Sequence, residues 1–145
     1  LFGLAAIAGI WLTGLLVDRW LRALTVLSLA LFAVSALVLG LAGQSAVAVL
    51  IGVAAWGLSF GGAPTLLQTA LADAAGEGAD VAQSMLVTVF NLAVASGGVA
   101  GGLLLGWLGA RALPWALGVL ALACLFVVWP ASHAGFRPGR RSMAA

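Results

Sequence analysis

Long apolar runs separated by short polar breaks constrain this chain more than any other feature. An α-helix needs roughly 20 apolar residues to cross a bilayer. Runs that approach or exceed this length cover residues 1–17, 23–41, 46–71, 84–108 and 113–129. Of the 145 residues, 64% are hydrophobic, more than a small soluble core can enclose. The sequence therefore predicts an all-α integral membrane protein, with five transmembrane helices in a bundle over residues 1–132 and a basic cytoplasmic tail over 133–145.

The placement of charge and cysteine excludes several classes of function. The net charge is +2, but the arginines stand at the ends of the apolar runs and not along one face, which argues against nucleic-acid binding. Cys124 is the single cysteine, so it supports neither a disulfide framework nor a metal cluster. The runs contain no acid–base pair or activated nucleophile. We therefore expect no enzyme activity, no catalytic or metal-binding residues and no cofactor.

Two further features concern the connections and the orientation. The stretch from Ala72 to Gln83 is acidic and is expected to be a loop, and Pro64 is expected to loosen or kink the third helix. With five spans, Arg19, Arg22 and three arginines of the tail share one side, and Arg111 stands alone on the other. Because cytoplasmic flanks carry the excess of arginine, the C-terminus is expected in the cytoplasm.

A charged cluster, GLLVDRWLR at residues 14–22, closes the first run. Arg19 and Arg22 follow a helix end that carries partial negative charge, so their position is favourable. Asp18 is not explained in this way, because a carboxylate at that helix end is mildly unfavourable unless Arg22, four residues on, or the N-terminus of another helix compensates it.

This cluster resembles the cytoplasmic loop motif of the major facilitator superfamily, G-x-L-a-D-r-x-G-r-k. The matching positions are Gly14, Leu16, Asp18, Arg19 and Arg22. Leu21 and Ala23 depart from the pattern, as in the weaker second copy of the motif, which lies between the eighth and ninth of twelve helices. In that family the motif aspartate is thought to face a helix N-terminus of the opposite half. The resemblance thus implies a gating role for Asp18 with its motif partners, and a purely topological role is the alternative.

Two longer phrases extend the resemblance over nearly the whole chain. LLQTALADAA and VTVFNLAVASGGVAGG look like the tenth and eleventh helices of the drug and sugar efflux branch, the arabinose or chloramphenicol efflux type. The five helices would then form most of one six-helix repeat, helices eight to twelve. In that family these two helices help line the central cavity, which implies solute contact for Trp56, Phe60, Gln68 and Asn91. Contact between helices is the alternative for these side chains.

Glycines recur at four-residue spacing in the fourth run. Small residues one turn apart let two membrane helices approach closely, so we expect a packing face there. Its members are Gly97, Gly98, Gly101, Gly102 and Gly106. The spacing is compatible with a static interface and with a face that slides during transport.

Together these patterns predict the C-terminal fragment of a secondary active efflux transporter of the bacterial inner membrane. It would export small drug-like or sugar-like solutes by proton antiport, with the solute, the lipid bilayer and a missing N-terminal half as partners. No Asp, Glu, Arg, Lys or His lies within a predicted span, so the coupling group is expected in the missing half. A non-transporting membrane scaffold or assembly subunit is the alternative function.

Overall fold

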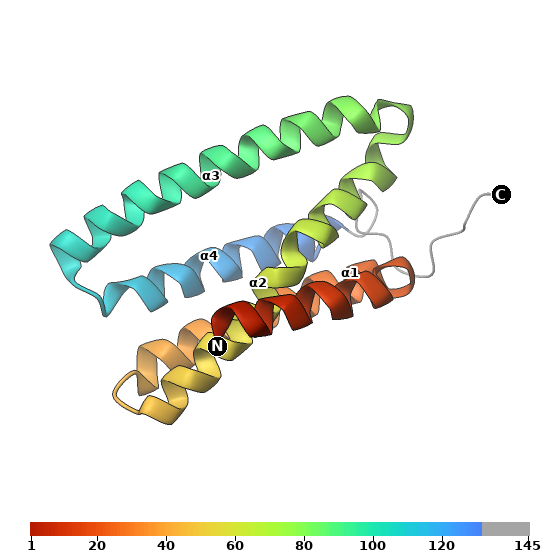
Figure 1. Cartoon of the computed structure of the whole chain (residues 1–145). Coiled ribbons are helices and arrows are strands. Elements are labelled where there is room, and N and C mark those ends of the chain that lie inside the picture. The colour runs from red at the N-terminus through yellow and green to blue at the C-terminus, as the bar shows by residue number, and fades with distance from the viewer. Residues whose placement is uncertain (132–145) are drawn as a thin grey trace.

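The computed structural model describes residues 1–131, and the predicted tail over 133–145 lies outside the described residues. The elements are α1 (Phe2–Ala42), α2 (Ala46–Ala75), the 3-10 turn η1 (Gly76–Gly78), α3 (Ala79–Leu108) and α4 (Ala112–Val128) (Figure 1). This part of the chain contains no strand, which agrees with the all-α prediction. By length and composition, two helical stretches could cross a membrane, Phe2–Ala42 and Ala46–Leu108, and α4 is a shorter apolar helix.

A kink at Trp20 divides α1 into two segments, 2–19 and 21–42. The 41 residues of α1 would extend about 60 Å as one rod, twice the thickness of a bilayer core. Trp20 has non-helical dihedral angles, φ −136° and ψ 29°. Figure 1 shows the chain turning back at this point. The polar break expected between the first two spans is therefore a kink of one residue and not a loop.

The first segment of α1 packs against α2 through glycines. A Cβ atom at Gly57 would stand 2.5 Å from the carbonyl oxygen of Phe2, and one at Gly61 would collide with the carbonyl of Ala6. Phe2 thus faces Gly57, and Ala6, four residues later, faces Gly61, so the first segment runs parallel to α2. We call this contact the glycine seam; its glycines are Gly9, Gly57, Gly61 and Gly62.

The second segment of α1 packs against α2 through serine hydroxyls. Ser35 Oγ donates to the carbonyl oxygen of Gly52 at 2.5 Å, and Ser28 Oγ donates to that of Ser59 at 2.9 Å. The later residue of this segment, Ser35, bonds to the earlier residue of α2, Gly52, so this segment is antiparallel to α2. The two segments of α1 consequently run in opposite directions along the same neighbour.

The acidic stretch predicted as a loop is largely helical, so that expectation was wrong. The helix α2 continues to Ala75, and α3 begins at Ala79 after the three residues of η1. Alanine is the strongest helix former and is frequent here, while the acidic side chains are exposed at the helix ends. Only Gly76, with φ +52°, adopts a backbone conformation that favours glycine. Helix α2 also remains helical through Pro64.

Helix α3 lies apart from the remaining helices (Figure 1). None of its residues is buried, although it contacts α2 and α4. Helix α4, by contrast, packs against α1: a Cβ at Gly40 would stand 3.2 Å from the ring of Trp115, and one at Gly118 would stand 3.6 Å from Cβ of Ala36. The packed part of the structure is therefore formed by α1, α2 and α4.

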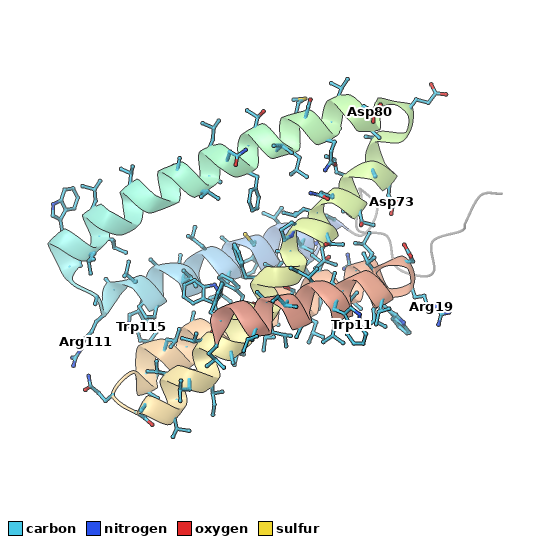
Figure 2. The ribbon with its side chains drawn as sticks, in the orientation of Figure 1. Trp11, Arg19, Asp73, Asp80, Arg111 and Trp115 are labelled. Carbon is cyan, nitrogen blue, oxygen red and sulfur yellow. The ribbon has the colours of Figure 1, made fainter. Side chains whose placement is uncertain are left out.

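The connections gather at two opposite ends of the bundle. The kink of α1, the turn η1 and the carboxyl end of α4 lie at one end, which we call the motif end (Figure 1). Figure 2 shows Arg19, Asp73 and Asp80 toward the motif end and Arg111 at the other. The charged residues of the described chain are thus placed at the ends of its helices.

Candidate functional site at the helix kink

The kink is held against α2 by a buried apolar cluster. Val17 precedes the kink and Leu21 follows it, and both pack with Leu66 and Ala70 of α2. The exposed fraction of each of these four side chains is 6% or less. Leu24 packs against the cluster from the next turn. Because residues on both sides of Trp20 are buried on the same helix, α2 fixes the direction in which α1 turns back.

Arg22 joins the kink to the carboxyl end of α4. Its Nη2 donates to the carbonyl oxygen of Trp129 at 2.8 Å, and its Nη1 donates to that of Val128 at a longer 3.5 Å. The last carbonyls of a helix have no partner within the helix, so these donors satisfy acceptors that would otherwise need water. The motif therefore lies where α1, α2 and α4 meet.

The other motif residues lie at the same end with different surroundings. Asp18 and Arg19 are exposed on the last turn before the kink. Gly14 is also exposed, and within residues 1–131 a Cβ atom there would meet nothing within 4 Å. Asp73, exposed on the last turn of α2, also lies toward the motif end and was not singled out from the sequence (Figure 2). The sequence could have indicated Asp73 as a candidate residue, because it is an acidic side chain at the end of an apolar run.

Two of the predicted solute-binding residues lie in an aromatic cluster against α1. The ring of Phe2 is 5.6 Å from that of Trp56, edge to face, and 6.0 Å from that of Phe60. Phe32 meets Trp56 edge to face at 6.1 Å. The indole Nε1 of Trp56 is buried, and no acceptor among residues 1–131 reaches it. Trp56 thus packs between both segments of α1, while Phe60 remains 43% exposed.

The other two predicted solute-binding residues are not part of this cluster. Gln68 is exposed on α2, about 12 Å along the helix from Phe60. Asn91 is exposed on α3. The described residues therefore form one aromatic cluster and two separate exposed amides, and solute contact by these side chains stays a prediction.

The predicted glycine face of α3 is open in the described structure. At Gly97, Gly98, Gly101, Gly102 and Gly106, a Cβ atom would meet nothing within 4 Å outside the backbone of α3. Their packing role stays a prediction. The close glycine contacts lie instead in the glycine seam, which the sequence interpretation missed. The four-residue spacing of Gly57 and Gly61 was the signal that could have revealed it.

Among the described residues, no three side chains of His, Cys, Asp or Glu are grouped so that they could hold a metal ion. Comparison with protein families gives a match to the family model described as Major Facilitator Superfamily, over residues 1–142. Neither the curated proteins nor the solved structures gave a match. The family match includes the kink, the aromatic cluster and the open face of α3.

Proposed function

The chain belongs to the Major Facilitator Superfamily, a family of membrane transporters and not of enzymes, and on that premise we propose that it is the C-terminal part of a secondary active efflux transporter. Transporters of this family move small-molecule solutes through a multi-pass membrane domain. We assign this chain to helices eight to twelve, and we propose small drug-like or sugar-like solutes as its cargo and proton antiport as its energy source.

The family match over residues 1–142 is the observation that carries the transport function, and the efflux branch, the cargo and the place in the fold are proposed from the sequence resemblance. The position of the motif supports it further. Asp18 and Arg19 are exposed at a helix reversal, where a second domain could reach them. A carboxylate facing a helix N-terminus is stabilised by a few tenths of a kcal/mol to about 2, enough to favour one end state of a rocking motion. We therefore propose that Asp18 helps to hold one closed state of the motif end.

Five crossings with a cytoplasmic C-terminus form part of the proposal. The segments 2–19 and 21–42 would extend about 27 and 33 Å, close to a 30 Å bilayer core. Tryptophans favour the membrane–water interface. Of the exposed tryptophans in residues 1–131, Trp20 and Trp129 stand at the motif end and Trp107 and Trp115 at the other, while Trp11 lies midway along the segment 2–19. The four tryptophans near the helix ends support helices that cross the membrane. The arginines Arg19 and Arg22 at the motif end, against Arg111 at the other, support a cytoplasmic motif end, and we propose a bacterial inner membrane as the location.

The open face of α3 supports a missing N-terminal half. A helix with five glycines and no buried residue presents a smooth surface on which another helix can pack closely. Alternating access requires two repeats that rock about a site between them. We propose that the N-terminal half covers this face and that Phe60, Gln68 and Asn91 meet the solute between the halves. The packing of Trp56 against two phenylalanines favours contact between helices for this residue.

The test uses the full-length protein in everted membrane vesicles energised by a proton gradient. Efflux activity appears as solute-dependent collapse of the gradient across a panel of drug-like and sugar-like compounds. We expect Asp18→Asn to reduce the transport rate severalfold without reducing membrane insertion. Glu77→Gln is the matched control, because Glu77 is an exposed acid in the turn η1 at the same end, and it should transport as wild type does. Equal rates for Asp18→Asn and wild type would remove the gating role.

The alternative function, a non-transporting scaffold, is not favoured by the family match. It predicts that no compound in the panel collapses the gradient, even when the full-length protein is inserted and monodisperse. That result would overturn the efflux proposal.

A further inference from the structure

The position of Arg22 is unfavourable for its own helix and favourable for another. Arg22 stands in the first turn after the kink, at the amino end of the segment 21–42, where a helix carries partial positive charge. Its guanidinium reaches the carbonyls of Val128 and Trp129 at the opposite kind of helix end, which carries partial negative charge. The carboxyl end of α4 therefore supplies acceptors that the amino end of the segment 21–42 cannot offer to this arginine.

Helix α4 follows the second segment of α1 along its length, in antiparallel register. Gly40 lies against Trp115, Ala36 lies against Gly118, and Arg22 reaches the end of α4. The first is a van der Waals contact between a glycine and an aromatic ring, and the second is one between two small residues. Arg22 is the polar contact at the motif end, where α4 has passed its last helical turn.

We propose that Arg22 is a clamp that fixes the carboxyl end of α4 to the kink, so that α4 and the second segment of α1 tilt as one body. Its consequence for transport rests on the proposed function, whereas the clamp itself requires no solute. Arg22 is thus a positioning residue. Its forked guanidinium offers separate nitrogens to two carbonyls, whereas lysine presents one compact ammonium group and cannot reproduce that geometry.

Hydrogen–deuterium exchange of the backbone amides of residues 124–131 tests the clamp, in the full-length protein in lipid nanodiscs without added solute. We expect Arg22→Met to accelerate exchange there about tenfold or more, because a charge-assisted contact no longer opposes local opening. Arg22→Lys should accelerate it less. Arg19→Met is the matched control: Arg19 is an exposed arginine of the same motif, and in the described part of the chain it makes no hydrogen bond to α4. It should leave exchange unchanged.

Several outcomes would overturn the clamp. One is wild-type exchange in an Arg22→Met protein that inserts and elutes as wild type does, and another is equal acceleration by Arg19→Met, which would indicate a general effect of charge. If Arg22→Met does not fold, Arg22→Lys decides, and wild-type exchange in that variant overturns the clamp.

In transport, Arg22→Lys should lower kcat with KM unchanged; a raised KM with normal exchange would place Arg22 at the solute. A protein that transports nothing fails the efflux proposal but leaves the exchange experiment intact.

Discussion

Replacing Gly61 by alanine tests the glycine seam most directly. A Cβ at this position would collide with the carbonyl oxygen of Ala6 and stand 2.8 Å from its Cα, where an ordinary contact begins at 3.4 Å. The helices must therefore move apart by about 0.6 Å or more. A gap of 0.5–1 Å forfeits roughly a quarter to a half of each dispersion contact, and overpacking of this kind costs about 1–3 kcal/mol.

Gly118→Ala is the matched control, because the new Cβ would stand 3.6 Å from Cβ of Ala36, an ordinary contact. Both substitutions gain about 1 kcal/mol of helix propensity, since alanine replaces glycine inside a helix. The two variants should therefore differ in stability by about 1–3 kcal/mol, with Gly61→Ala the less stable.

The assay is the free energy of unfolding of the full-length protein in mixed detergent micelles, with the thermal midpoint as a second measure. A Gly61→Ala variant that is as stable as Gly118→Ala would refute the reasoning, because it would mean that the first segment of α1 does not approach α2 backbone to backbone.

Two further substitutions probe polar groups between helices. Ser35→Ala removes a buried hydroxyl bonded to Gly52 and should lower the free energy of unfolding by about 0.6 kcal/mol, at most roughly 1.7. Ser96→Ala is the control and should be neutral in the same assay, because the Ser96 hydroxyl bonds to Leu92 of its own exposed helix. Equal losses of stability in the two variants would contradict the interhelical bond. Trp56→Phe removes an indole N–H that has no acceptor within residues 1–131, and the removal of this unpaired donor offsets the lost ring volume. The free energy of unfolding of Trp56→Phe should therefore stay within about 1 kcal/mol of the wild-type value, whereas Trp56→Ala should lose about 3–5 kcal/mol. If Trp56→Phe is as unstable as Trp56→Ala, the indole has an acceptor in the full-length protein.

The sequence predicted the helical character of the chain because a run of apolar residues leaves the backbone few other ways to satisfy its hydrogen bonds in a membrane. It predicted less well where helices end. The stretch from Ala72 to Gln83 was expected to be a loop because it is hydrophilic, yet its alanines favour helix and its acids can reach water from a helix end. Polarity identified the end of the apolar run and not the end of the helix.

The candidate site could be predicted in part. The motif pattern at residues 14–22 located the kink and its exposed acid, but it did not reveal that Arg22 meets α4, because that contact joins residues 106 and 107 positions apart. The same limit applies to the glycines. Gly57 with Gly61 and Gly97 with Gly101 have identical spacing, and only the fold decides which pair meets another backbone in the described chain. The spacing of glycines defines a face of one helix, whereas close packing also depends on the helix that lies opposite that face.

The reversal at Trp20 has a mechanical consequence. A single residue joins the two antiparallel segments of α1, so the carboxyl end of the first and the amino end of the second cannot separate. A displacement of the carboxyl end of the segment 2–19 must therefore displace the amino end of the segment 21–42 as well. The three-residue connection at Gly76–Gly78 is longer and leaves α3 freer to follow a different course from α2.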